Sequence, residues 1–153
     1  MLGRSVVLSW MLCVAAWGGG DFALQDTPLR VAGIGLGTTA LAVRATLGTP
    51  DLEQQSLGLR FWDYKGRGIT VIWQEGDAGV RGIQLNRAVA GDVGGVKVGD
   101  SETALRKTWG SPARVRQQGR YVDFVGAEWV LSAELSQGKI AQMTLMRASA
   151  APR

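Results

Sequence analysis

The apolar positions follow a helical period in residues 40–47 and again in residues 102–109. Within each segment two apolar side chains stand four positions apart and form one stripe, as in a helix that packs one face on a core. The pairs are Val43 with Leu47 and Leu105 with Trp109. A hydroxyl side chain that suits an N-cap stands before each segment, Thr39 before the first and Ser101 before the second. A glycine that suits a left-handed C′ position follows each segment, and a proline comes two residues later; these are Gly48 and Pro50, then Gly110 and Pro112. The pattern predicts two helices of about two turns.

Elsewhere the apolar and polar positions alternate, which predicts strands. The expected strands cover residues 57–65, 68–74, 80–86, 119–125, 128–134 and 139–146. A short extended piece, 31–36 or 93–98, comes before each helix. Helices this short are marginal alone and must dock on a sheet. We therefore expect an α+β fold of two tandem repeats, each a short helix packed on an antiparallel three-stranded meander.

An internal repeat underlies this division. Residues 35–50 align with residues 97–112 at a constant offset of 62, and the match resumes at an offset of 60, where FWDYKG aligns with YVDFVG. The expected organisation is a signal peptide in residues 1–20, repeat unit 1 in 29–88, repeat unit 2 in 91–147 and a disordered tail in 148–153.

The glycines of VAGIGLGTTALAV, residues 31–43, resemble a nucleotide-binding loop only superficially. Such a loop needs the pattern G-x-G-x-x-G between a strand and a crossover helix. Position 38 is a threonine, and Gly35 aligns with Lys97 in the second unit. We interpret Gly37 and its equivalent Gly99 as turn residues that lead into a helix.

Composition indicates a globular protein with a mild positive charge. The chain has 46% hydrophobic and 20% charged residues, and its formal net charge is +4. The arginines are spread along the chain, without the Lys/Arg block that marks a nucleic-acid arm. We therefore expect no specific nucleic-acid partner.

The first twenty residues predict an export signal. Arg4 is followed by SVVLSWMLCVAAWGGG, an apolar run too short to span a bilayer as a helix. Small residues place the cleavage site near Gly18 to Gly20, so we expect a periplasmic or secreted protein. An uncleaved N-terminal anchor is the alternative, and the leader is the only expected contact with a membrane. Cys13 lacks the small residue before it that lipidation requires.

The expected mature chain contains neither cysteine nor histidine, because Cys13 lies in the leader and the sequence has no histidine. This excludes thiol and histidine catalysis and zinc sites built on those residues, and we expect no catalytic, cofactor-binding or metal-binding residues. Asp63 and Asp123 occupy equivalent repeat positions. They could act as an acid–base pair if the sheet brought them within about 5–10 Å. In the competing interpretation they accept hydrogen bonds, in particular from Arg44 and Arg106.

Two features predict a surface that binds another protein, either acidic or envelope-associated. Trp73 aligns with Ala133 near a strand end, so we expect an exposed indole of the kind that anchors interfaces. Basic residues gather in the second unit as candidate contacts, namely Arg106, Lys107, Arg114, Arg116 and Arg120. Arg114 and Arg116 alternate along an extended segment and should point the same way. A merely solvated charged face is the alternative interpretation.

The repeat pattern resembles the SmpA/OmlA family of outer-membrane assembly proteins and is similar to the tandem-unit β-lactamase inhibitor protein family. The residues that carry the resemblance are Gly37, Thr39, Val43, Leu47, Gly48, Pro50, Phe61 and Tyr64, with Gly99, Ser101, Leu105, Trp109, Gly110, Pro112, Tyr121 and Phe124. The resemblance implies an exported, non-enzymatic protein that binds other proteins or envelope components. It departs from both families, because the lipoprotein cysteine context and the paired disulfides are absent.

We therefore expect a non-catalytic protein-binding module of the bacterial envelope, an assembly factor or an inhibitor. The alternative is a small-ligand carrier, or an enzyme that uses carboxylates, in the groove between the repeats.

Overall fold

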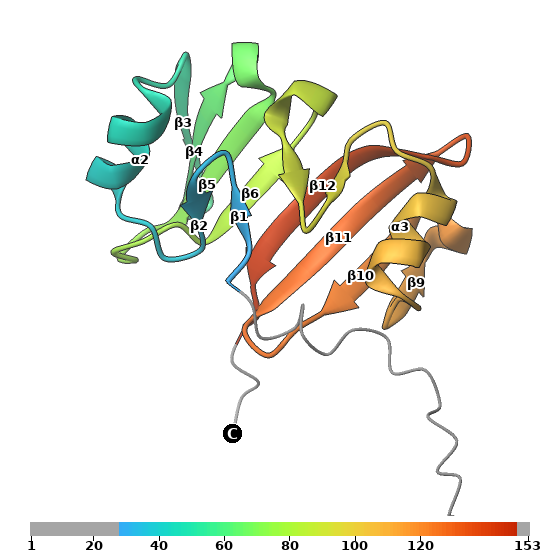
Figure 1. Ribbon diagram of the computed structural model, residues 1–153. Coiled ribbons are helices and arrows are strands. Elements are labelled where there is room, and N and C mark those ends of the chain that lie inside the picture. Colours follow the sequence, from blue (N-terminus) through green and yellow to red (C-terminus); the bar gives the residue numbers. More distant parts are fainter. Residues whose placement is uncertain (1–27, 150–153) are drawn as a thin grey trace, which may run out of the picture.

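The computed structural model describes residues 28–149, and Figure 1 shows the arrangement of their elements. The described chain contains twelve strands, two α-helices and three 3-10 turns. In chain order these are β1 (Arg30–Val31), β2 (Ile34–Gly35), α2 (Ala40–Leu47), β3 (Leu52–Ser56), β4 (Leu59–Tyr64), η1 (Lys65–Arg67), β5 (Ile69–Gln74), β6 (Gly82–Leu85), η2 (Ala88–Ala90), β7 (Asp92–Val93), β8 (Val96–Lys97), α3 (Glu102–Trp109), β9 (Arg114–Arg116), η3 (Gln117–Gly119), β10 (Tyr121–Val125), β11 (Trp129–Ser136) and β12 (Lys139–Arg147). The predicted leader lies outside the described residues, as does most of the predicted tail.

One antiparallel sheet of eight strands forms the body of the molecule, in the order β3-β4-β5-β6-β12-β11-β10-β9. The predicted fold class is therefore wrong: the protein is mostly β, and it does not consist of two helices that each pack on a separate three-stranded meander. The halves of the chain join where β6 pairs with β12, with Gln84 opposite Thr144 and Ile83 opposite Leu145. This pairing satisfies backbone groups that two separate sheets would leave open at their edges.

The two edge strands, β3 and β9, were not predicted. β3 has the sequence LEQQS and β9 the sequence RVR, and apart from Leu52 their side chains are exposed. An edge strand with no buried face needs no apolar alternation, so the pattern of hydrophobic positions does not reveal it. The six predicted strands are confirmed as β4, β5, β6, β10, β11 and β12, with ends that shift by at most two residues.

Both predicted helices are confirmed at their predicted ends, because local chemistry sets them. The side chains of Thr39 and Ser101 accept hydrogen bonds from backbone N–H groups in the first turn of α2 and α3. Gly48 and Gly110 end the helices with φ of 85° and 77°, a region that favours glycine. Their ψ values of −161° and −151° are extended and not left-handed helical, unlike the predicted conformation.

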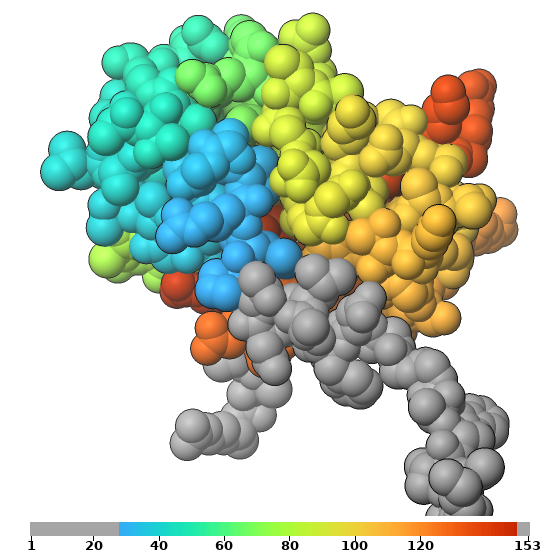
Figure 2. All heavy atoms as spheres, viewed as in Figure 1, coloured from blue at the N-terminus to red at the C-terminus, as the bar shows by residue number. Residues whose placement is uncertain are grey.

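The two extended pieces predicted before the helices are small hairpins, β1-β2 and β7-β8. Both hairpins and both helices lie on the same face of the sheet (Figure 1). Figure 2 shows the hairpins side by side between α2 and α3, and β1 contacts β7. This face of the sheet is referred to below as the covered face.

A single hydrophobic core lies under the covered face and includes residues from both halves of the chain. Val43 of α2 and Leu105 of α3 are fully buried in it, as are Val31 and Val93 of the hairpins. The two predicted units, 29–88 and 91–147, therefore share one core, a point that the sequence alone left open. No helix of the described residues is long and apolar enough to cross a membrane.

Candidate functional site

The opposite face of the sheet carries no helix or hairpin of the described residues, and we call it the uncovered face. Cross-strand pairing places a row of side chains across it, one from each strand. In order from β3 to β9 the row is Leu52, Asp63, Thr70, Gln84, Thr144, Ser132, Asp123 and Arg114. Beyond Leu52 every member is polar, so a continuous band of hydrogen-bonding groups crosses seven strands.

A second row, mostly apolar, runs beside the polar row on the same face. It follows from the same register and consists of Phe61, Ile72, Gly82, Met146, Val130 and Val125. Gly82 leaves room for the side chain of Met146, because a Cβ at position 82 would overlap the sulfur atom. The uncovered face thus presents an apolar row with a row of hydrogen-bonding groups along one side.

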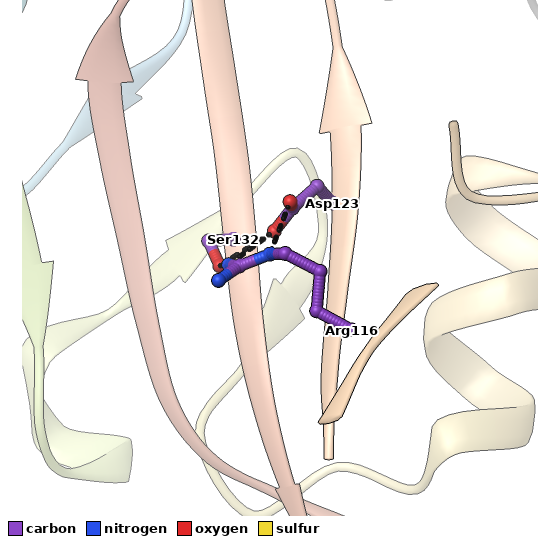
Figure 3. A network of polar contacts seen from close by, with 3 residues as sticks. All are labelled: Arg116, Asp123 and Ser132. Atoms are coloured by element: carbon purple, nitrogen blue, oxygen red, sulfur yellow. Dashed lines mark hydrogen bonds and ion pairs between the residues drawn. The ribbon is translucent and has the colours of Figure 1, made fainter. Parts of the chain in front are cut away.

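The strongest polar cluster of the uncovered face lies at its β9 end (Figure 3). Arg116 donates two hydrogen bonds to the Asp123 carboxylate, from Nε to Oδ2 at 2.8 Å and from Nη2 to Oδ1 at 2.9 Å. Ser132 donates to Oδ1 at 2.8 Å and accepts from Nη2 of Arg116 at 3.0 Å. The geometry is the two-point contact that a guanidinium makes with a carboxylate.

The cluster holds Asp123 in its charged form. The hydrogen bonds from Arg116 lower the pKa of Asp123, and the Ser132 hydroxyl and the charge of Arg114 lower this pKa further. Burial of the carboxyl group raises the pKa but does not outweigh these effects. The same hydrogen bonds raise the pKa of Arg116. Asp123 is therefore an acceptor that is already satisfied, which makes it a poor general acid or base.

Arg120 forms a second, similar contact next to this cluster. Its guanidinium donates to Oε1 of Glu134 from Nε at 3.0 Å and from Nη2 at 2.6 Å. Arg116 and Arg120 both lie over the ring of Tyr121, with Cζ at 5.2 and 5.5 Å from the ring centroid. The ring of Tyr121 thus contacts two guanidinium groups that are each paired with an acid.

The predicted basic residues do not form one patch, because they lie on both sides of the sheet. Arg114 and Arg116 point the same way, as predicted, onto the uncovered face with Asp123. Arg106 and Lys107 belong to α3, on the covered face, where Arg106 pairs with Glu102 at 2.8 Å. The structure brings Arg114, Arg116 and Arg120 together at one end of the uncovered face and separates them from the other two.

Trp73 is not the exposed anchor that the sequence predicted. Its side chain is 1% exposed, and its ring centroid lies 4.9 Å from that of Trp62. On β5 it alternates with Ile69 and Val71, so all three point into the core under the covered face. The prediction rested on the alignment of Trp73 with Ala133, whereas the alternation of side chains along β5 determines that the indole is buried.

Asp63 and Asp123 are too far apart to act as an acid–base pair. They lie on β4 and β10, five strand spacings apart in the sheet, which corresponds to roughly 24 Å. Asp63 accepts a hydrogen bond from Thr70 at 2.7 Å. The predicted contact with Arg44 is wrong, since Arg44 pairs with Glu53 and lies over Trp62. Within residues 28–149, no group of three or more His, Cys, Asp or Glu residues could hold a metal ion.

Most members of the uncovered face were not predicted from the sequence. Tyr121, Ser132 and Glu134 take part in the arginine contacts, and of these three the sequence pattern singles out only Tyr121, as a position that carries the repeat. Alternation could have assigned them to one side of β10 and β11, because Val122, Phe124, Leu131 and Ala133 take the buried side.

The sequence matches no known protein-family model, and it matches no curated protein. The solved structures that match in fold include the following two. A cysteine-rich secretory protein from Staphylococcus aureus subsp. aureus Mu50 has a TM-score of 0.58 and 11% identity, over 78% of this chain and 47% of that chain. An extracellular protein containing a SCP domain, from Bacillus anthracis str. Ames, has a TM-score of 0.49 and 11% identity, over 72% of this chain and 43% of that chain.

The chain thus spans less than half the length of the solved structures it resembles. At this identity the likeness concerns the fold alone. The resemblance to the SmpA/OmlA and β-lactamase inhibitor protein families is wrong, because the matching structures belong to neither. What the comparison shows is a sheet architecture that also occurs in a bacterial secretory protein.

Proposed function

We propose that this chain is an exported, non-catalytic module that binds another protein through the uncovered face of its sheet. The predicted leader and the name of the similar structure with a TM-score of 0.58, a cysteine-rich secretory protein, support export. The separation of Asp63 from Asp123 argues against the carboxylate chemistry that was the alternative.

The observation that carries the proposal is the composition of the uncovered face. Its apolar row contains Phe61 and Met146, and Tyr121 lies across the polar row from it with Arg116 and Arg120. Aromatic residues, Met and Arg are the side chains enriched at protein interfaces, and a rim of hydrogen-bonding groups is typical of them. The polar row from Asp63 to Arg114 provides such groups along the whole apolar row.

The pairing of the arginines defines the partner more closely. Arg116 and Arg120 are each engaged with a carboxylate of the same face, so most of the positive charge of this end is neutralised. Arg114 pairs with no acid within residues 28–149. The partner surface we propose is therefore largely apolar and polar, with an acidic group opposite Arg114.

Site-specific crosslinking in cells tests this proposal. A photoreactive benzoylphenylalanine is placed at Phe61 or Val125, the two ends of the apolar row, and for comparison at Thr103 on the exposed side of α3. We expect the same protein to be crosslinked from Phe61 and Val125 and not from Thr103. The substitution Val130→Glu, which places a charge in the row between Met146 and Val125, should remove both crosslinks while circular dichroism shows an unchanged fold.

Two results would overturn the proposal. One is a partner that crosslinks from Thr103 but from neither end of the apolar row, which would place the interface on the covered side. The other is the absence of any crosslinked protein at all three positions in cells that export the chain.

A further inference from the structure

A cleft of about 430 Å³ opens on the covered side, away from the proposed protein interface. One wall comes from the β1-β2 hairpin and the loop that leads to α2; the other comes from the β10-β11 turn and the end of β12. Its lining includes Leu29, Arg30, Leu36, Glu128, Trp129 and Arg147. The cleft therefore lies between the two halves of the chain, and its volume is typical of a small-molecule site.

Two guanidinium groups border this cleft. Arg147 stands opposite Trp129 in the β11-β12 register, and its Nη2 reaches Gly37 across the cleft, where a Cβ would lie 3.2 Å away. Arg30 is oriented by a hydrogen bond from Nη1 to the Gly33 carbonyl oxygen at 3.1 Å. Among the described residues that line the cleft, Glu128 is the only acid.

Neither guanidinium belongs to an ion pair among the described residues, in contrast to Arg44, Arg81, Arg106, Arg116 and Arg120. The remaining lining is largely apolar or backbone, with Leu29, Leu36 and Trp129 as its largest apolar side chains. A ligand that suits these walls carries one negative charge for the arginines and an apolar body for the leucines and the indole.

We propose that this cleft binds a small organic anion, a carboxylate or sulfonate with an aromatic or aliphatic body. Arg30 and Arg147 bind the anionic group from opposite walls, and the apolar body lies against Leu36 and Trp129. This inference is independent of the proposed protein partner, since the cleft and the uncovered face lie on opposite sides of the sheet.

Titration of the ¹⁵N-labelled chain with 1-naphthoate, followed by ¹H–¹⁵N NMR, tests the inference. We expect saturable shift changes that concentrate at Gly35, Thr38 and Ala127, which line the cleft. The uncharged analogue 1-naphthylmethanol should bind at least tenfold more weakly, because it lacks the group that the arginines bind. The double variant Arg30→Gln/Arg147→Gln should lose at least tenfold in affinity for 1-naphthoate.

Arg60→Gln/Arg87→Gln is the matched control, because both residues are exposed and neither lines the cleft. This control should bind 1-naphthoate as the unaltered chain does, and the NMR spectra report whether each variant is folded. The inference is overturned if the shifts do not saturate or fall outside the cleft. It is overturned equally if the alcohol binds as tightly as the acid, or if folded Arg30→Gln/Arg147→Gln keeps its affinity.

Discussion

Arg116 binds Asp123 diagonally across two strands. In the β9-β10 register Arg116 stands opposite Tyr121, and its side chain extends two residues along β10 to reach the carboxylate. The equivalent position in the first half is Gln54, opposite Phe61, and among the described residues the Asp63 carboxylate accepts only from Thr70. At these equivalent positions, Asp123 in the second half of the sheet is bound by a charged guanidinium, whereas Asp63 in the first half is bound by one neutral hydroxyl.

This difference predicts unequal effects of removing the two carboxylates. Asp123→Asn should lower the free energy of unfolding by about 1–2 kcal/mol, because it breaks a charged two-point contact whose arginine is half exposed. Asp63→Asn should cost about 0.5 kcal/mol, since one hydroxyl hydrogen bond remains possible. Urea unfolding at pH 7 measures both. Equal losses would show that Arg116 adds nothing to the stability of the sheet.

The lowered pKa of Asp123 predicts an acid-dependent contribution to stability. Arg116 lowers this pKa in the folded state, whereas the unfolded value is about 3.9. The contribution is therefore fully present above that pH and is lost as the pH falls through it toward the folded pKa. The difference in unfolding free energy between the unaltered chain and Asp123→Asn should shrink from pH 6 to pH 3. A difference that stays constant over this range would contradict the assignment.

The helices could be predicted because residues close in sequence determine where they begin and end. The pairing of strands far apart in sequence could not be predicted in this way. Thr39 and Ser101 cap their helices through contacts three residues away, so the sequence around them contains the whole signal. The pairing of β6 with β12 joins residues about sixty positions apart. Strand alternation shows which side chains are buried but not which strands are neighbours, so a single sheet could not be distinguished from two.

The candidate site shows the same limit. The common direction of Arg114 and Arg116 follows from a period of two and was predicted. Their separation from Arg106 depends on which side of β10 the helix α3 covers, and that is set by Trp109 packing on Phe124 and Trp129. Charged residues close in sequence can therefore lie on opposite sides of a sheet.

Gly79 is expected to tolerate no side chain, because it lies against the loop before α2. A Cβ at this position would overlap the carbonyl oxygen of Gly37, and Gly79 bridges to the cap residue Thr39. Gly79→Ala should lower the free energy of unfolding by about 1–3 kcal/mol. Gly66→Ala is the control, since open space surrounds Gly66, and it should change stability by less than about 0.5 kcal/mol. Thermal unfolding of the two variants at equal concentration compares them.

Trp73 is expected to affect stability and not partner binding. Trp73→Ala removes a fully buried indole and should cost about 3–5 kcal/mol. Trp73→Phe keeps part of that packing, so this variant should remain folded and retain the crosslinks from Phe61 and Val125. A folded Trp73→Phe chain that loses those crosslinks would show that the indole acts at the interface after all.

Tyr64 predicts an asymmetry between the ends of the two helices. Its hydroxyl donates to the carbonyl oxygen of Gly48 at 3.1 Å and so binds the end of α2 to β4, whereas Phe124 stands at the equivalent place after α3. Tyr64→Phe should lower the free energy of unfolding by about 1 kcal/mol at pH 7, because it removes that hydrogen bond.

This contribution of Tyr64 should depend on pH. Burial raises the pKa of Tyr64, so the neutral hydroxyl stabilises the fold below about pH 10, and this contribution is lost as the pH rises through the folded pKa. Urea unfolding at pH 7 and pH 11 measures the difference in unfolding free energy between the unaltered chain and Tyr64→Phe. We expect this difference to be smaller at pH 11 or to change sign. A difference that is the same at both pH values would mean that the hydroxyl does not titrate with unfolding.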